Sequence, residues 1–435
     1  MSPRSHRTAV YLLLIKCRGI ILMKLVHVSH LGLTNFRNFA RLEVDLPKGP
    51  VVLWGDNGDG KSNFLEAIFF LATTRSAYAS SDRQLIHWLA WKESQPFARL
   101  TARIERERGP LRVEVLLKGR PLEEPWTLEE PEGPGISKRI RLNQVPRRAI
   151  DALGEFQVVM FHPQDVDLVA GSPSERRRYL DVANSQLDRR YARSLSQLGR
   201  VLLQRNSLLR RIRDEGATPD QLEFWDQQLA EYGAYVVLQR GRFVSELGPL
   251  ANGEHQRLTG EKKPLRVAYM SALGQKEPVE TADLEYDALA KRLALSLGRE
   301  RSREIAAGAS LVGPHRDDLQ FTVDGIDMNA YGSRGEQRTI ALSLKLAEAN
   351  LFLARSGDRP VLLLDDVLSE LDPARRAHLL ASFLPGQQAI VTATDLGGCP
   401  QDFLRGACLM RVQEGRLDAQ GAGLSIDALP HLTQP

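Results

Sequence analysis

The fold is decided by residues 55–62 of the sequence, Gly55-Asp56-Asn57-Gly58-Asp59-Gly60-Lys61-Ser62. They match the pattern G-x-x-x-x-G-K-[ST], in which glycines let backbone N–H groups wrap phosphate oxygens at the start of a helix. The apolar run 51–54 precedes the stretch and a helical pattern at 62–73 follows it, as such a site requires. We therefore favour a nucleotide site over a chance glycine-rich turn. The expected binding set is the whole stretch with Asn63, in which Lys61 balances the β- and γ-phosphates and Ser62 binds Mg²⁺.

A second chemical feature is the pair Asp365-Asp366, which directly follows the apolar run 361–364. This run predicts a buried strand that carries two carboxylates to its C-terminal edge, where α/β sheets bind ligands. We expect Asp365 to hold Mg²⁺ through water, and Asp366 to orient or deprotonate the attacking water. By itself the pair is better explained by a solvated strand end or a helix cap. Together with the phosphate loop, the functional interpretation is favoured.

A third feature, Ser-Arg-Gly-Glu-Gln at 333–337, stands at the start of a long amphipathic helix. It provides a second helix N-terminus with a small hydroxyl and a glycine, which is again an anion site. The expected nucleotide contacts are Ser333, Gly335 and Gln337. An ordinary loop-to-helix start explains Ser and Gly at this position about as often as function does. However, the feature precedes the aspartate pair, and Ser-Glu-Leu-Asp at 369–372 follows the pair, an order that resembles an ABC-type ATPase head.

Composition is that of an ordinary folded protein. Of 435 residues, 43% are hydrophobic and 26% are charged, which excludes a disordered or collagen-like chain. The formal net charge of +4 comes from the basic residues of 1–22, so net charge carries no information about nucleic acid. Cys17, Cys399 and Cys408 show neither metal-ligand spacing nor an even framework, as expected for free thiols in a reducing cytosol. Beyond residues 1–22 no apolar run approaches a membrane span of roughly 18 to 20 residues, so a cytoplasmic location is expected.

A local excess of basic residues lies at 174–213, where eleven arginines face three acidic residues. A solvated helix face is the usual meaning of such a run. The excess also suits contact with DNA phosphates, whose attraction carries little sequence information. The two interpretations are equally favoured. The DNA-binding candidates are Arg176, Arg177, Arg178, Arg189, Arg190 and Arg193.

Taken together, these motifs resemble the RecF family of bacterial recombination-repair ATPases, which are related to SMC heads. The resemblance runs from about Met23 to the C-terminal region. Its marks are residues 33–38, 61–63, 161–165, 171–173 with 176–178, 204–206, 313–318, 333–337 and 365–366. Two other classes share the phosphate loop. A transporter's nucleotide-binding subunit is disfavoured by the helical insert and by the lack of an Asp-Glu pair, and in a P-loop kinase residues 333–337 would have no role.

The resemblance implies an α/β fold, namely an ABC-type P-loop ATPase head with mixed and parallel sheets, an inserted helical lobe and no long coiled coil. The expected domains are an N-terminal extension (1–22), an ATPase part with the phosphate loop (23–172), a helical lobe (173–307) and a C-terminal ATPase part (308–435). Residues 1–22 resemble a short signal peptide but lack a small-x-small cleavage site. A mis-assigned start, with the true one at Met23, explains them at least as well.

The resemblance also implies ATP-driven dimerisation, in which Ser333 of one protomer contacts the γ-phosphate held by the other's phosphate loop. Slow hydrolysis, a weak DNA-dependent ATPase activity used as a switch, then opens the clamp. Arg37 would approach the phosphates, Gln164 would link the γ-phosphate to the helical lobe, and the catalytic set would be Asp366, Lys61 and Gln164. Asp366 stands where such heads usually carry Glu, and residues 392–395 stand where a histidine is common, so slow turnover is expected.

The partners implied by the resemblance are DNA, a second copy of the chain, RecR and RecO, and the cofactors are ATP and Mg²⁺. Family members bind DNA with ATP, recognise junctions of single strand and duplex at gaps, and work with RecR and RecO to load RecA in recombinational repair and the SOS response. No membrane partner is expected.

Overall fold

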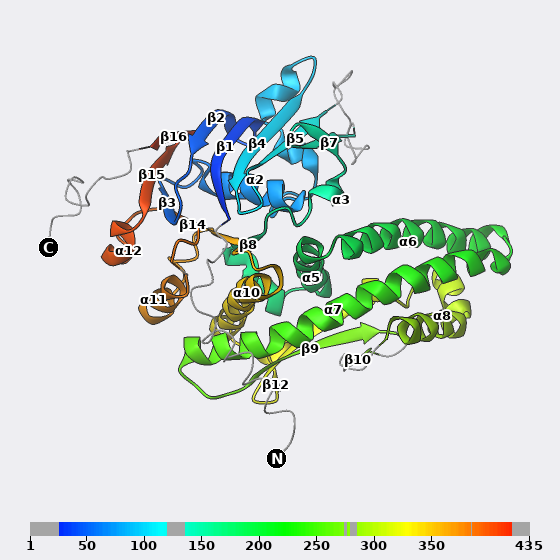
Figure 1. Cartoon of the computed structure of the whole chain (residues 1–435). Coiled ribbons are helices and arrows are strands. Elements are labelled where there is room, and N and C mark those ends of the chain that lie inside the picture. Colours follow the sequence, from blue (N-terminus) through cyan, green and yellow to red (C-terminus); the bar gives the residue numbers. More distant parts are fainter. Residues whose placement is uncertain (1–25, 120–134, 274–275, 279–284, 384, 420–435) are drawn as a thin grey trace.

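The computed structural model describes residues 26–119, 135–273, 276–278, 285–383 and 385–419. The expectation about residues 1–22 lies outside the described residues. The described chain forms three sheets and a set of long helices. In Figure 1 the two six-stranded sheets lie together at one end of the molecule, and the helices α6 (Arg189–Glu215) and α7 (Leu222–Thr259) lie at the other end.

The phosphate loop leaves the middle of a mixed six-stranded sheet. The strands, in spatial order, are β16 (Arg416–Ala419), β15 (Cys408–Gln413), β3 (Pro50–Trp54), β14 (Ala389–Ala393), β13 (Val361–Leu364) and β8 (Val158–Phe161). Neighbours pair in parallel, except that β15 and β16 form an antiparallel hairpin. Because parallel strands end at one edge of the sheet, the loop after β3 and the aspartates after β13 share that edge. Only β14 separates the two strands.

Alternate residues of β13 face two different cores. Val361 and Leu363 pack into a core with α2 (Lys61–Thr73), whereas Leu362 and Leu364 pack into a core with α10 (Arg334–Ser356). All four are at most 2% exposed, since a parallel strand with a helix on each face has no solvated side. The buried strand predicted from this apolar run is confirmed.

An antiparallel sheet covers the other side of α2. The strands, in spatial order, are β2 (Phe39–Asp45), β1 (His27–Phe36), β4 (Phe97–Glu105), β5 (Leu111–Lys118), β6 (Ser137–Leu142) and β7 (Val145–Arg147). Their inward side chains share one core with α2 and with one face of the mixed sheet. Every residue of α2 from Phe64 to Thr73 is buried, because the helix is sandwiched between two sheets. The helix that follows the phosphate loop is thereby held rigidly from both sides.

The helical lobe consists of α5 (Pro173–Leu187), α6 (Arg189–Glu215), α7 (Leu222–Thr259) and α8 (Tyr286–Ala307). In Figure 1, α6 and α7 run side by side away from the two six-stranded sheets. The 27 residues of α6 span roughly 40 Å at about 1.5 Å per residue. α7, the longest described helix with 38 residues, spans roughly 57 Å, so the described lobe contains no long coiled coil. Among the described helices, none combines the length and the apolarity that crossing a bilayer demands.

The lobe also contains a four-stranded sheet that joins the expected helical insert to the C-terminal part of the chain. The strands, in spatial order, are β10 (Lys276–Pro278), β9 (Leu265–Ala272), β11 (Asp318–Val323) and β12 (Ile326–Asp327). β9 and β11 pair in antiparallel although they lie on opposite sides of the expected boundary at residue 307. β9 carries apolar residues on both faces, with Val267 and Ala268 both half-buried, so it lacks the alternation by which a strand is recognised.

The remaining elements are short and connect the larger ones. The α-helices are α3 (Ala149–Ala152), α4 (Asp167–Ala170), α9 (Met328–Tyr331), α11 (Pro373–Ala381) and α12 (Gln401–Arg405). The 3-10 turns are η1 (Asp82–Leu85), η2 (Trp88–Lys92), η3 (Pro163–Val166), η4 (Pro219–Gln221) and η6 (Pro314–Arg316).

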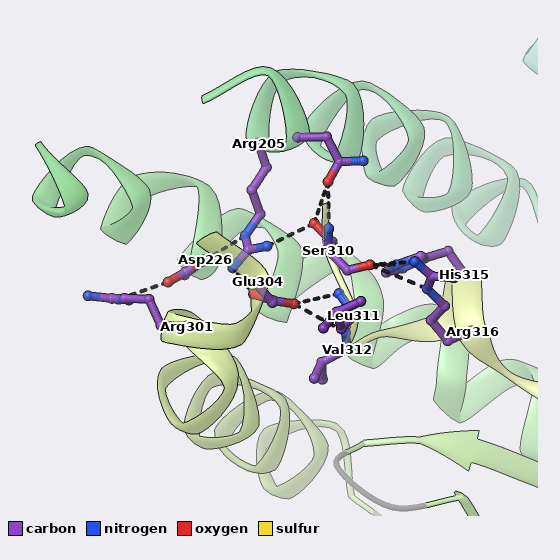
Figure 2. A network of polar contacts seen from close by, with 10 residues as sticks. Arg205, Asp226, Arg301, Glu304, Ser310, Leu311, Val312, His315 and Arg316 are labelled. Carbon is purple, nitrogen blue, oxygen red and sulfur yellow. Dashed lines mark hydrogen bonds and ion pairs between the residues drawn. The ribbon is translucent and has the colours of Figure 1, made fainter. Parts of the chain in front are cut away.

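A buried ionic network fastens α6, α7 and α8 together (Figure 2). Arg205 on α6 is fully buried, and its Nε and Nη2 donate to Asp226 Oδ1 at 2.8 Å and to Glu304 Oε2 at 2.6 Å. Its Nη1 donates to the hydroxyl of Ser310 at 2.8 Å. The other oxygen of Glu304 accepts the backbone N–H of Leu311 at 2.7 Å. Three helices and the segment that leads into β11 are thus joined through one guanidinium.

We expect Arg205→Ala to lower the free energy of unfolding by about 3–5 kcal/mol, because it leaves the buried carboxylate of Glu304 without its counter-charge and removes one of the two arginines that pair with Asp226. Urea denaturation followed by circular dichroism measures this change. Arg200→Ala is the control, since Arg200 lies on the same helix but is exposed, and its effect should stay within about 0.5 kcal/mol. A loss below about 1 kcal/mol for Arg205→Ala would show that the network does not stabilise the lobe.

Candidate nucleotide-binding site

The phosphate loop has a backbone that favours glycine at Gly55, Gly58 and Gly60, and at the first and last of these a close neighbour also excludes a side chain. Gly55 and Gly60 have φ of +152° and +112°. A Cβ on Gly55 would lie 2.1 Å from the carbonyl oxygen of Val412, and one on Gly60 would lie 2.5 Å from the side-chain amide of Asn38. The loop is therefore packed tightly against β15 and against the β1–β2 turn. The two glycines of the motif are required by close approach as well as by backbone conformation.

Asp59 ties the loop to its surroundings. Its Oδ2 accepts the backbone N–H of Asp56 at 3.0 Å, and its Oδ1 accepts that of Glu414 at 3.1 Å. Its carbonyl oxygen accepts the N–H of Gly415 at 3.0 Å and the side-chain amide of Asn38 at 2.8 Å. The hairpin β15–β16 and the β1–β2 turn thus hold the loop in shape from two sides.

Lys61 closes the loop from within. Its Nζ donates to the carbonyl oxygens of Gly55 and Asp56, each at 2.7 Å, and the side chain is only 7% exposed. The side-chain amide of Asn63 donates to Asn38 Oδ1 at 2.8 Å, so Asn63 supports the turn that contacts the loop. Between these anchors, residues 56–58 are exposed, which leaves the outer part of the loop open to a ligand.

Ser62 and Asp365, which are far apart in sequence, meet at the edge of the mixed sheet. The hydroxyl of Ser62 donates to Asp365 Oδ1 at 2.9 Å, and Thr392 Oγ1 donates to the same oxygen at 2.8 Å. The other oxygen, Oδ2, accepts the hydroxyl of Tyr78 at 2.5 Å. Burial and the Asp365 carboxylate raise the pKa of Tyr78 above its ordinary value, so the tyrosine remains a protonated donor.

This pair of oxygen donors fits a magnesium ion. Mg²⁺ is usually bound by one or two carboxylates together with substrate phosphates and water, rather than by a cage of protein ligands. Within the described ranges no group of three or more His, Cys, Asp or Glu side chains gathers as a metal site. Ser62 and Asp365, next to the phosphate loop, are the residues that would hold Mg²⁺ with a nucleotide.

Asp366 stands beside this pair with its carboxylate free. Its φ is +50°, a left-handed conformation that aspartate tolerates better than most residues. Its backbone N–H donates to Thr392 Oγ1 at 2.8 Å, which fixes the strand end. The carboxylate is partly exposed and accepts no hydrogen bond from any described residue. It is therefore available to a water or a ligand at this edge.

Arg37 lies next to the loop but is engaged elsewhere. Its Nε and Nη2 donate to the fully buried carboxylate of Glu66 on α2 at 2.7 and 2.8 Å, and its Nη1 donates to the carbonyl oxygen of Gln84 at 3.1 Å. Approach of Arg37 to a phosphate would require these bonds to be exchanged. Its expected role in nucleotide binding stays a prediction.

Gln164 lines a cavity of about 370 Å³ between the mixed sheet, α5 and α10. Tyr78 lines the same cavity, as do two ionisable residues of α10, the half-buried Lys345 and the buried Glu348. Lys345 Nζ lies 3.6 Å from Asp165 Oδ1 and 3.9 Å from Glu348 Oε2, and burial raises the pKa of Glu348 to about 7. Gln164 thus lies where the sheet meets the helical lobe, and its catalytic assignment stays a prediction.

The segment 333–337 caps α10. Ser333 Oγ and Glu336 form a capping box, in which the Ser333 backbone N–H donates to Glu336 Oε2 at 2.9 Å, and these bonds hold the pKa of Glu336 below its ordinary value. Ser333 and Gly335 are exposed, but Gln337 is buried and its amide donates to the carbonyl oxygen of Met328 at 3.1 Å. Gln337 therefore supports the helix start from within, and a direct contact with nucleotide would require it to leave this position.

No hydrogen bond or ion pair in the described part of the chain joins residues 333–337 to residues 55–63. The second anion site predicted from the sequence is thus formed, but it is not joined to the phosphate loop of the same molecule. An exposed helix N-terminus of this kind is free to meet a phosphate presented by another chain.

The arginines proposed as DNA contacts lie where the helical lobe meets its neighbours, and the first of them is corrected by the structure. Arg176 is 5% exposed, and its guanidinium donates to Asp318 Oδ1 at 2.5 Å and to the carbonyl oxygen of Gly171 at 2.7 Å. A buried, fully bonded guanidinium cannot reach a DNA phosphate, so Arg176 is a structural residue. The half-buried Arg177 donates to the carbonyl oxygen of Asp317 at 2.9 Å.

The other four candidates are exposed, and all four have contacts within the chain. Arg178 Nη2 donates to the carbonyl oxygen of Ser76 at 2.7 Å, Arg189 pairs with Glu155, Arg193 Nη2 lies 3.5 Å from Asp151 Oδ1, and the guanidinium of Arg190 lies 4.2 Å from the centroid of the Tyr235 ring. The acidic partners lie outside residues 174–213, so the count along the sequence overstates the unpaired charge of this segment. Contact of these four with DNA stays a prediction.

Three residues of the site were missed by sequence reasoning. Two of them could have been found from the sequence, since Thr392 lies near the end of β14, the strand beside β13, and Asn38 belongs to the segment 33–38 that carries the family resemblance. Tyr78 lies in a loop that has no sequence pattern, and only the structure shows its bond to Asp365.

Comparison with known proteins agrees with this geometry. The family profile described as RecF/RecN/SMC N terminal domain matches residues 27–397. The DNA replication and repair protein RecF of Chloroflexus aurantiacus is 47% identical over 401 residues, which cover 91% of this chain and all of that protein. This chain belongs to the RecF family. The RecF protein of Halalkalibacterium halodurans is 36% identical and also covers 91% of the chain.

Solved structures of RecF share the fold. The recombination mediator protein RecF-ATP in the RecFOR pathway superposes with a TM-score of 0.79 at 29% identity, covering 93% of this chain and all of that one. The RecF-ATPrS form superposes with a TM-score of 0.78 and covers 91% and 98% of the two chains. The ABC-type ATPase fold expected for this family member is thereby confirmed.

Proposed function

We propose that this chain is an ATP-dependent DNA replication and repair protein, in which two copies enclose ATP and Mg²⁺ and act as a clamp on DNA. The observation that carries the proposal is the contact of Ser62 with Asp365 at the mouth of a preformed phosphate loop. A hydroxyl and a carboxylate beside backbone N–H groups form the set that binds a magnesium nucleotide. The RecF relatives that share the fold include an ATP form, which supports the same ligand.

Each residue of the site has a proposed task. Lys61, already inside the loop, neutralises the phosphates, and Ser62 and Asp365 hold the metal ion, which when bound offsets charge on the β- and γ-phosphates. Asp366 orients or deprotonates the attacking water, and its free carboxylate supports this role. Gln164 couples nucleotide binding to the helical lobe, because it lines the cavity between the mixed sheet and that lobe. Because Asp366 has one methylene fewer than glutamate, hydrolysis is slow and serves as a switch.

Dimerisation completes the site. Ser333 and Gly335 are exposed at a helix N-terminus, and the phosphate loop leaves residues 56–58 open. Two copies related by a two-fold axis place the helix start of each against the γ-phosphate of the other. Hydrolysis removes the shared phosphate and opens the clamp.

The DNA contacts come from exposed arginines at the base of the helical lobe. Among them Arg190 forms no ion pair with a described residue, and its guanidinium lies over the Tyr235 ring. The clamp acts at single-strand gaps and at junctions of single strand and duplex, together with RecO and RecR, and promotes RecA loading. This part of the proposal rests on family membership.

The proposal is tested by size-exclusion chromatography with light scattering. The wild type should be a monomer without nucleotide or with ADP, a dimer with ATP and Mg²⁺, and a dimer that co-elutes with gapped duplex when DNA is added. Lys61→Met should remain a monomer under all conditions, because the charge that offsets the phosphates is gone. A wild type that stays monomeric at saturating ATP contradicts the clamp.

A further inference from the structure

The loop between α2 and η1 contains a tight turn at residues 76–79. The hydroxyl oxygen of Ser76 accepts the backbone N–H groups of Tyr78 at 3.0 Å and of Ala79 at 2.6 Å. The same hydroxyl donates to Glu66, the buried carboxylate that also holds Arg37. The turn is therefore fixed to α2, and it presents the ring of Tyr78 toward the mixed sheet.

Tyr78 determines how the carboxylate of Asp365 is oriented. Its hydroxyl donates to Oδ2 at 2.5 Å, while Oδ1 faces Ser62. A metal-binding carboxylate uses one oxygen for the ion, and a hydrogen bond to the other oxygen fixes its rotation. Without the tyrosine hydroxyl, Oδ2 has no hydrogen-bond donor among the described residues, and the carboxylate is held only through Oδ1.

The turn is also attached to the helical lobe. Arg178 of α5 donates through Nη2 to the carbonyl oxygen of Ser76 at 2.7 Å and to that of Ala77 at 3.4 Å. Arg178 and Tyr78 both line the cavity that contains Gln164. A short path of direct contacts thus leads from α5 through the turn to Asp365, and it does not pass through Gln164.

We propose that Tyr78 is a positioning residue for the magnesium nucleotide, which holds Asp365 in the orientation that binds the metal ion, and that Arg178 sets the position of Tyr78 from the helical lobe. The proposal rests on the proposed function, because it needs a metal ion at Ser62 and Asp365. It adds a contact through which movement of α5 alters the affinity for the magnesium nucleotide.

The test is a magnesium titration of nucleotide binding, measured by the fluorescence anisotropy of a labelled, non-hydrolysable ATP analogue. Tyr78→Phe should raise the magnesium concentration at half-saturation about tenfold, since loss of such a supporting contact costs about 10- to 100-fold in metal affinity. Affinity for the analogue in EDTA should stay at the wild-type value. Tyr235→Phe is the matched control, because it removes another tyrosine–aspartate hydrogen bond, to Asp188 Oδ2 at 2.6 Å, and it should titrate like the wild type.

Arg178→Gln tests the second half of the proposal in the same assay without DNA. If Arg178 acts through the turn, the double variant with Tyr78→Phe should lose less than the product of the two single losses, because both changes affect one contact. Losses that multiply independently overturn this half.

Two results overturn the role of Tyr78: a wild-type magnesium titration for Tyr78→Phe, or an equal loss of affinity in EDTA, which would locate the defect outside the metal site. The proposed function fails separately, and this proposal with it, if the wild type does not bind the analogue with magnesium.

Discussion

Asp366→Asn is expected to lower the turnover of ATP by roughly 10²- to 10⁴-fold, the usual contribution of a general base, while ATP binding is retained. The amide cannot accept the proton of the attacking water, but it has nearly the same shape as the carboxylate. Asparagine also tolerates the left-handed backbone found here, at φ +50°, so the fold should be unaffected. ATP-dependent dimers of this variant should persist, because the step that opens them is blocked. Phosphate release and the dimer lifetime after removal of free ATP measure the two effects.

The control for this substitution is Asp402→Asn on α12. Asp402 is fully exposed and forms only a surface ion pair with Arg405. The turnover of ATP by the Asp402→Asn variant should therefore stay within about twofold of the wild-type value. Turnover of Asp366→Asn at or above the wild-type rate would show that another group activates the water.

Ser333→Asp is expected to abolish the ATP-dependent dimer while the monomer still binds ATP. Aspartate accepts the N-cap bond as well as serine does, but it loses the bond that the Ser333 hydroxyl donates to Glu336 Oε2 at 2.7 Å, so circular dichroism of the variant must show that α10 is retained. In the dimer, however, the new carboxylate would face the partner's γ-phosphate. At about 4 Å and an effective dielectric of about 20, two unit charges repel by about 4 kcal/mol, which weakens each composite site roughly a thousandfold. Light scattering with ATP measures the loss.

Two comparisons isolate the cause. Ser333→Arg, which removes the cap and fills the space, should also prevent the dimer. Ser196→Asp, at an exposed position of α6, makes the same change in net charge and should dimerise normally. A stable ATP-dependent dimer of Ser333→Asp would mean that this helix start does not meet the triphosphate.

Those features whose signal is local could be predicted from the sequence. Short sequence motifs predict the phosphate loop and the strand before Asp365. The helix start at Ser333 is specified by its own capping box. The fold followed from their order. What could not be predicted depends on contacts between distant segments. The sheet formed by β9 and β11 joins residues about fifty apart, and β9 has apolar residues on both faces.

The same limit applies to the site and to its charges. The run of arginines at 174–213 looks unpaired along the sequence because its acidic partners, such as Asp318 and Glu155, come from elsewhere. Gln337 and Arg37 sit at positions that the motif marks, yet both side chains are engaged by neighbours, Met328 and Glu66. The hydroxyl of Tyr78 donates to Asp365, a residue distant in sequence. No pattern in the loop that contains Tyr78 predicts this contact.

The order of strands in the mixed sheet has a consequence for synthesis on the ribosome. β3 carries the phosphate loop near the start of the chain, but both of its neighbours, β14 and β15, are among the last segments made. At about 5–20 residues per second, the intervening stretch takes on the order of tens of seconds to emerge. A nascent or truncated chain that ends before residue 389 lacks both neighbours of β3 and the hairpin that holds Asp59, so we expect its phosphate loop not to keep the shape that binds nucleotide. Competence to bind ATP is then expected only of the nearly finished polypeptide.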